Sequence, residues 1–78
     1  MLKLYYSDAC PHCQRILGFL KENPSIEVEM INVLSVDGAR EELAKKGGQS
    51  MIPALSIDDK IMYESADIYN WLHDKYSN

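Results

Sequence analysis

The chain has 78 residues, of which 46% are hydrophobic and 26% are charged, and its formal net charge is −4. This length and composition predict one globular domain spanning residues 1–78. The acidic balance and the lack of a Lys- and Arg-rich cluster argue against nucleic-acid binding. No apolar stretch approaches the roughly 20 residues of a membrane span, and no signal-peptide pattern opens the chain. We therefore expect a monomeric cytoplasmic protein that binds neither nucleic acid nor a membrane.

The first part of the chain has the pattern of a strand, a helix and a second strand. Residues 3–6 predict a short strand, and residues 27–33 predict another. Pro11 suits the first turn of a helix, where its missing N–H needs no partner. The helix is expected to end at Asn23-Pro24. Its apolar stripe, at helical spacing, is Cys13, Ile16, Leu17 and Leu20.

The middle of the chain predicts a second helix. Asp37 is expected to cap its start, and Gly47-Gly48 to end it. A helix beginning there would turn one set of apolar residues toward the core. The inner face is predicted to be Val36, Ala39 and Leu43.

The last part of the chain predicts a hairpin followed by a third helix. Residues 54–57 and 60–63 are expected to be strands joined at Asp58-Asp59. Ser65 is expected to cap the helix, and Asp67 in its first turn favours the helix dipole. The inward-facing residues are predicted to be Ile68, Leu72 and Tyr76.

The order of these elements is β-α-β-α-β-β-α. A strand–helix–strand unit with a right-handed crossover gives parallel strands, and the hairpin adds antiparallel ones. The sequence therefore predicts an α/β fold with a four-stranded mixed sheet and three helices.

The two cysteines, Cys10 and Cys13, lie between the first strand and the first helix. Cys10 is expected at the helix N-terminus, where unpaired N–H groups and the positive end of the dipole stabilise a thiolate. A thiolate is the species that attacks a disulfide. Cys13 lies on the inward stripe, so we expect it to resolve the mixed disulfide, with Pro11 holding the turn between the two sulfurs. The alternatives are two structural cysteines or half of a metal site.

Three further segments of the chain hold candidates for the same site. His12, as a cation, would further stabilise a Cys10 thiolate, although it can equally be a plain surface residue. Pro53 begins a strand, and the bond that joins it to Ile52 is a candidate cis peptide. Glu64 and Ser65 precede the last helix, where an acid and an anion site could hold a ligand with an amine and a carboxylate; a plain helix cap is the simpler interpretation.

Together these residues resemble the glutaredoxins, which have the thioredoxin-like fold. Residues 5–13, which end in Cys-Pro-His-Cys, are similar to the glutaredoxin active-site segment. Met51-Ile52-Pro53 is similar to the family's Thr-Val-Pro segment, in which the proline is cis. Residues 63–68 resemble the glutathione-binding stretch of the glutathione-transferase-like glutaredoxins.

The resemblance implies a set of glutathione contacts. Ile52 would bind the cysteinyl backbone of glutathione beside Pro53. Glu64 and Ser65, with Asp67, would hold the γ-glutamyl end. Arg40 falls where many glutaredoxins bind the glycine carboxylate.

Three positions depart from the glutaredoxin pattern. His12 replaces the usual tyrosine and gives the motif of the periplasmic oxidase DsbA. Ser7 stands where many glutaredoxins have a cation, which puts the affinity for glutathione in question. Met51 replaces a threonine.

The resemblance implies a dithiol thiol–disulfide oxidoreductase that reduces protein disulfides and glutathione mixed disulfides through Cys10 and Cys13. Glutathione would be its co-substrate, recycled by glutathione reductase, and we expect no tightly bound cofactor and no metal. One alternative is a redoxin reduced by a flavoprotein thioredoxin reductase. Others are a metal or iron–sulfur carrier, which Pro11 argues against, and a binding domain like the first half of a glutathione transferase.

Overall fold

The computed structural model describes residues 2–58 and 60–76, and in this part of the chain the predicted elements occur in the predicted order. The strands are β1 (Leu2–Tyr6), β2 (Val28–Asn32), β3 (Ala54–Ile57) and β4 (Lys60–Met62). The helices are α1 (Pro11–Glu22), α2 (Ala39–Gly47) and α3 (Ser65–Tyr76). None of these described helices has both the length and the hydropathy of a membrane span.

The strands form one mixed sheet in the order β2-β1-β3-β4. β1 and β2 are parallel, whereas β3 is antiparallel to β1 and to β4. The segments that follow β1, β2 and β4 and the segment that precedes β3 therefore meet at one edge of the sheet, which we call the carboxyl edge of β1. The predicted α/β fold and its mixed sheet are confirmed.

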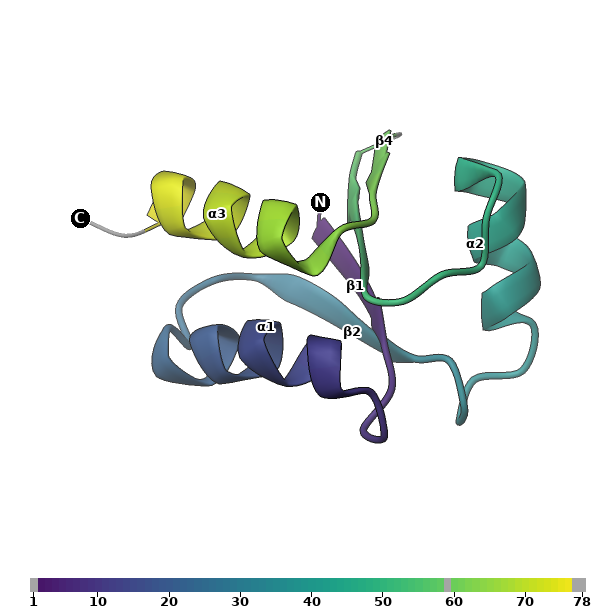
Figure 1. The fold of residues 1–78 in the computed structure, drawn as a ribbon, viewed down its shortest axis with the longest axis horizontal. Coiled ribbons are helices and arrows are strands. Elements are labelled where there is room, and N and C mark those ends of the chain that lie inside the picture. The colour runs from purple at the N-terminus through teal and green to yellow at the C-terminus, as the bar shows by residue number, and fades with distance from the viewer. Residues whose placement is uncertain (1, 59, 77–78) are drawn as a thin grey trace.

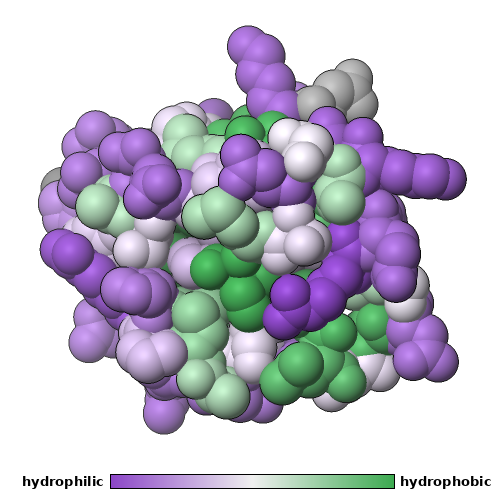
Figure 2. Space-filling view, turned by 45° about the vertical axis from the view of Figure 1, so that its right-hand side comes forward, coloured by the Kyte–Doolittle hydropathy of each residue, from purple (hydrophilic) through white to green (hydrophobic). Residues whose placement is uncertain are grey.

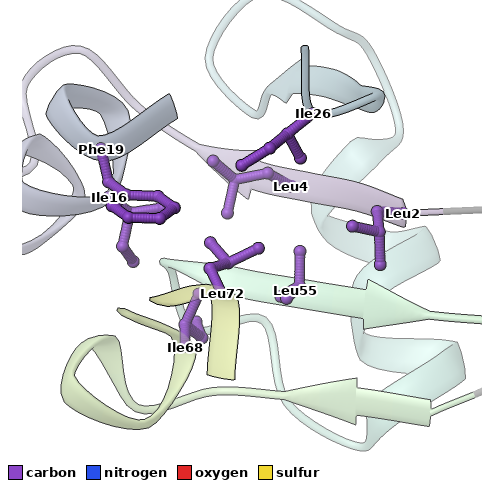
Figure 3. Packing of buried hydrophobic residues seen from close by; sticks show 8 residues of the cluster. All are labelled: Leu2, Leu4, Ile16, Phe19, Ile26, Leu55, Ile68 and Leu72. Carbon is purple, nitrogen blue, oxygen red and sulfur yellow. The ribbon is translucent and has the colours of Figure 1, made fainter. Parts of the chain in front are cut away.

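The helices cover both faces of the sheet (Figure 1). α1 and α3 pack side by side on one face, and α2 lies on the other. Figure 3 shows the larger core, in which side chains of α1 and α3 meet those of β1 and β3. Its buried members are Leu2, Leu4, Ile16, Phe19, Ile26, Leu55, Ile68 and Leu72. The smaller core, beneath α2, contains Tyr5, Ile31, Val33, Ala39, Leu43 and Ala54.

The inward face of α1 differs in part from the predicted stripe. Cys13 and Ile16 are fully buried, as expected. Phe19 is also buried, whereas Leu17 and Leu20 are only half-buried. The reason is that α1 packs against both the sheet and α3, which turns Phe19 toward Tyr69 with ring centroids 5.4 Å apart.

The predicted start of the second helix was wrong. α2 begins at Ala39, and its N-cap is Gly38, whose φ of 80° lies in the left-handed region that favours glycine. Asp37 therefore does not cap the helix, and Val36 is 49% exposed. The segment before Gly38 forms hydrogen-bonded turns on Asn32 in place of a helical turn, because the N–H groups of Ser35 and Val36 both donate to the Asn32 carbonyl.

The last helix starts one residue earlier than its predicted cap implies. Ser65 is the first helical residue, and the Glu64 carbonyl accepts the first helical hydrogen bond, from the Ile68 N–H at 2.9 Å. Glu64 thus occupies the cap position in place of Ser65. In the preceding hairpin, Asp58 has a φ of 56°; Asp59, the other predicted turn residue, lies outside the described residues.

Candidate active site

The two cysteines lie at the carboxyl edge of β1, one helical turn apart. Cys10 is the N-cap of α1, with an extended backbone, and Pro11 opens the helix. The Cys10 N–H donates to the Ser7 carbonyl at 3.2 Å, and the Cys13 N–H donates to the Cys10 carbonyl at 3.1 Å. Both thiols are free; Cys10 is half-buried, whereas Cys13 is fully buried. This arrangement leaves Cys10 as the thiol that a substrate can reach.

The surroundings of Cys13 hold its proton. Burial raises the pKa of the Cys13 thiol from 9.0 to about 12, because the charged form would be desolvated. A hydrogen bond with the Cys10 side chain and the charge on Cys10 are smaller contributions to the same rise in pKa, and a hydrogen bond from the Ser7 backbone opposes it. At neutral pH, Cys13 is therefore a protonated thiol beneath Cys10.

The loop that carries Cys10 is fixed by its own polar groups and by the end of β2. Ser7 is buried, and its hydroxyl accepts a hydrogen bond from the Ala9 N–H at 3.2 Å. The Asp8 carbonyl accepts from the Gln14 side chain at 3.2 Å. Across the loop, the Asn32 side-chain amide donates to the Asp8 carboxylate at 3.2 Å. Asn32 was not among the predicted site residues, because the sequence marks it only as an amide near the end of a predicted strand.

A cavity of about 250 Å³ opens beside the cysteine loop. Three segments that are distant in sequence form its walls: the start of α1, the segment before β3 and the segment between β4 and α3. The lining residues are His12, Met51, Ile52, Pro53, Tyr63, Glu64 and Ser65. The Ile52–Pro53 peptide is cis, as the resemblance implied. The structure thus brings together most of the side chains proposed from sequence.

Tyr63, which lines the cavity, had no predicted role of its own. Its hydroxyl donates to the Gln49 carbonyl at 2.8 Å and accepts from the Gln49 N–H at 3.2 Å. These bonds join the end of β4 to the segment that leaves α2. Gly47 permits the approach, since a Cβ atom there would meet the Tyr63 ring.

Two of the predicted ligand residues do not line this cavity. Arg40 is exposed in the first turn of α2, which lies on the other face of the sheet from α1 and α3. Asp67 is exposed in the first turn of α3. Two larger hollows, of about 450 and 540 Å³, also exist, but the described lining residues of neither include any part of the loop before α1 or of α1 itself. The smaller cavity is the candidate site because it is lined by His12, which lies between the two cysteines in the chain, and by the cis Pro53.

Two comparisons with known proteins indicate the family of this chain. The family described as "Glutathione S-transferase, N-terminal domain" matches residues 4–78. An uncharacterised glutaredoxin-like 8.6 kDa protein of the rubredoxin operon of Clostridium pasteurianum is 32% identical over 62 residues, which cover 80% of this chain and 81% of that protein.

Two solved structures show the same fold. An epsilon-class glutathione S-transferase from the housefly, Musca domestica, has a TM-score of 0.74 at 29% identity; the match covers this entire chain but only 36% of that one. A glutaredoxin from Archaeoglobus fulgidus has a TM-score of 0.71 at 24% identity and covers 88% of this chain and 82% of that one. This chain therefore spans about a third of the length of the transferase.

The mixed sheet, the Cys-x-x-Cys at a helix N-terminus and the cis proline define a thioredoxin-like protein. Within that class, the chain belongs to the glutaredoxin family, and its sequence also fits the related N-terminal domain of the glutathione S-transferases.

Proposed function

We propose that this protein is a dithiol thiol–disulfide oxidoreductase that reduces protein disulfides and glutathione mixed disulfides. One observation carries the proposal: a half-buried Cys10 at a helix N-terminus lies directly over a buried, protonated Cys13, beside a cavity that can hold a substrate. The first thiol is placed to attack, and the second is kept out of side reactions until it is needed.

In the first step, the Cys10 thiolate attacks one sulfur of the substrate disulfide. A new S–S bond joins Cys10 to that sulfur, and the old S–S bond breaks. The other substrate sulfur leaves as a thiolate and takes a proton from solvent.

In the second step, Cys13 loses its proton and attacks the Cys10 sulfur. The mixed disulfide breaks, the second substrate thiol is released, and a Cys10–Cys13 disulfide remains. The substrate has gained two electrons, and the protein dithiol has lost them. Two molecules of glutathione then restore the dithiol by two exchanges of the same kind and leave as oxidised glutathione.

The cavity supports the proposed glutathione pose. Ile52 and Pro53 lie on one wall and Glu64 and Ser65 on another. The N-terminus of α3 offers unpaired N–H groups to the carboxylate of a γ-glutamyl end, and Glu64 offers a partner for its amine. The resemblance to glutaredoxins is the basis for proposing contacts with Arg40 and Asp67, since neither residue lines the cavity.

One observation favours a second electron donor. Ser7 is buried and hydrogen-bonded within its own loop, so the cation that many glutaredoxins have at this position is replaced by a neutral hydroxyl. Loss of a cation weakens the attraction for a glutathione carboxylate. A redoxin reduced by a flavoprotein thioredoxin reductase is therefore the second candidate.

A coupled assay tests the proposal and separates the two donors. The wild-type protein is given a mixed disulfide of glutathione and 2-mercaptoethanol, with either glutathione and glutathione reductase or thioredoxin reductase as the source of electrons. We expect turnover with glutathione, no activity in Cys10→Ser, and a mixed disulfide trapped at Cys10 in Cys13→Ser, which keeps activity on glutathione mixed disulfides. Faster iodoacetamide labelling of Cys13 than of Cys10 at neutral pH would contradict the assigned roles. A visible absorbance band in freshly purified protein would instead support an iron–sulfur carrier.

A further inference from the structure

Two exposed apolar side chains lie on the turn that follows β2. Leu34 is 65% exposed and Val36 is 49% exposed. We call these two residues the apolar turn. Figure 2 shows hydrophobic residues gathered along the lower edge of the molecule, where the segments after β1 and β2 lie in Figure 1. Removing an aliphatic side chain from water lowers the free energy, so two exposed aliphatic side chains on one turn can bind an apolar side chain of a partner.

The apolar turn is held in place by Asn32. The Asn32 carbonyl accepts hydrogen bonds from the N–H groups of Ser35 and Val36, both at 3.0 Å. Its side-chain oxygen accepts from the Leu34 N–H at 3.0 Å, and its side-chain amide donates to Asp8 in the cysteine loop. Leu34 and Val36 are therefore presented on a fixed turn that is tied to the loop of Cys10.

The order of the strands places the apolar turn and the cavity on opposite sides of Cys10. β2 is the neighbour of β1 on one side, and β3 and β4 lie on the other. The apolar turn follows β2, whereas the cavity is lined by the segments before β3 and after β4. A ligand that fills the cavity and reaches Cys10 leaves the apolar turn uncovered.

The negative charges beside the apolar turn favour a ligand that carries a positive charge. Asp37 follows Val36 directly and is exposed, and Asp8, also exposed, is hydrogen-bonded to Asn32. A glutathione molecule that is bound through its γ-glutamyl end has only a glycine left to extend past Cys10. That glycine has no apolar side chain, and its carboxylate would be repelled by the two aspartates.

We propose that the apolar turn is the docking surface for a protein substrate, which places an apolar side chain and a Lys or Arg beside its disulfide cysteine. The proposal rests on the proposed function, because it assigns the substrate of the same Cys10. The apolar side chain of the substrate covers Leu34 and Val36, and its cation pairs with Asp8 and Asp37. The cavity and the apolar turn then sort substrates into glutathione and protein chains.

The test compares three disulfides with glutathione as reductant. Two are homodimers of short peptides, one with Leu and Lys beside its cysteine and one with Ser and Glu; the third is the mixed disulfide of glutathione and 2-mercaptoethanol. We expect kcat/KM to be about tenfold higher for the Leu-Lys peptide than for the Ser-Glu peptide, the size expected for partial burial of two aliphatic side chains. In the double variant Leu34→Ser/Val36→Ser this preference should fall below about threefold. Activity on the small mixed disulfide should not change.

Met30→Ser is the matched control. Met30 is an exposed hydrophobic residue of β2, 41% exposed, and lies before the carboxyl edge. The control variant should keep the peptide preference. Equal kcat/KM for the two peptides with the wild-type protein, or an unchanged preference in the double variant, overturns the inference while the proposed function stands. A wild-type protein that reduces none of the three disulfides overturns the proposed function and, with it, the inference.

Discussion

At the residue scale, Cys10 and Cys13 have different surroundings although they share one turn of α1. The pKa of Cys13 is raised by desolvation and also by a hydrogen bond with the Cys10 side chain and by the charge of Cys10. When Cys10 is bound in a mixed disulfide, its charge and its thiol hydrogen bond are gone, and the desolvation of Cys13 is left, opposed by the hydrogen bond from the Ser7 backbone. The mixed disulfide therefore makes Cys13 easier to deprotonate at the stage at which it must attack.

This coupling can be measured by removing the Cys10 side chain. We expect Cys10→Ala to lower the pKa of Cys13 below the value of about 12 in the reduced wild-type protein. The pKa should stay above 9.0, because burial is the largest cause of the shift and is retained. The ultraviolet absorbance of the thiolate, followed against pH, gives the value. If Cys13 in Cys10→Ala has the same pKa as in the wild-type protein, Cys10 contributes nothing to the shift.

His12 gives a second prediction at this scale. It is exposed and lines the cavity beside Cys10. A cation there stabilises the reduced thiolate but not the uncharged disulfide, which raises the reduction potential. His12→Tyr should lower the potential by no more than about 30–60 mV, because solvent screens an exposed charge.

A glutathione redox titration checks the effect of His12. His73→Tyr, at an exposed histidine in the last turn of α3, is the control and should leave the potential unchanged. An equal or higher potential in His12→Tyr would make His12 an ordinary surface residue.

At the element scale, two helical glycines should respond in opposite ways to alanine. Gly18 in α1 has open space where the methyl group of an alanine would lie, so Gly18→Ala should stabilise the protein by about 1 kcal/mol. At Gly47 in α2, a Cβ atom would lie 2.9 Å from the Tyr63 ring and 3.0 Å from the Ile61 Cβ. Gly47→Ala should therefore destabilise the protein by roughly 1–3 kcal/mol, and it should weaken glutathione binding by moving Tyr63. Urea unfolding of both variants tests the pair, and equal stability of Gly47→Ala and wild type would refute the packing argument.

The sequence was most informative where one residue type dictates the local backbone. Pro11 predicted the start of α1, because its ring fixes φ and it has no N–H to pair. Gly47-Gly48 predicted the end of α2, because glycine readily adopts the left-handed conformation that Gly48 has at the C-cap, with a φ of 88°. Val36 was misplaced because its spacing to Ala39 and Leu43 fits a helix. Periodicity cannot show that the Asn32 carbonyl will draw the intervening N–H groups into turns.

Burial on two faces was also beyond the pattern of β1. Alternation along a strand puts Leu2, Leu4 and Tyr6 on one face, but Tyr5 on the other face is fully buried as well. An inner strand that is covered by helices on both faces has no exposed side. The strand order that makes β1 an inner strand depends on pairing over long distances in the chain, which local patterns do not contain.

At the scale of the whole molecule, the fold brings together the segments that were predicted to form the site. Segments around His12, Ile52 and Glu64 meet at one cavity because the strand directions bring their loops to the same edge. Arg40 does not line this cavity, because its helix lies on the opposite face of the sheet from α1 and α3. The sequence motifs thus predicted which segments lie near the cysteines. The three-dimensional arrangement shows which side chains of these segments line the cavity.

The stability of the whole molecule should fall in alkali. The pKa of the Cys13 thiol is about 12 in the folded protein, whereas in the unfolded chain it is near the ordinary value of 9.0. The contribution of Cys13 to the free energy of unfolding is therefore fully present below about pH 9, and it declines as the pH rises toward 12. Burial, with a contribution from the charge of Glu42, also raises the pKa of Tyr5, which acts in the same direction.

Unfolding of the reduced protein in urea at several pH values measures this decline. We expect a loss of about 1–2 kcal/mol near pH 10.5 relative to pH 8. Cys13→Ala should show a smaller loss over the same interval, whatever its stability at neutral pH. The same slope in both proteins would show that Cys13 does not control the alkaline transition.

The inner position of β1 has a consequence for the synthesis of the chain. β1 pairs with β2 on one side and with β3 on the other, yet β3 begins only at Ala54. Until β3 has been made, one long side of β1 has no partner, and an unpaired strand edge promotes association between chains. Cys10 and Cys13 follow β1 directly, so both thiols leave the ribosome well before the fold that shields Cys13 is complete. The nascent chain is therefore most sensitive to oxidation and misassembly in this interval, and that is when reductants and chaperones have their largest effect on its yield.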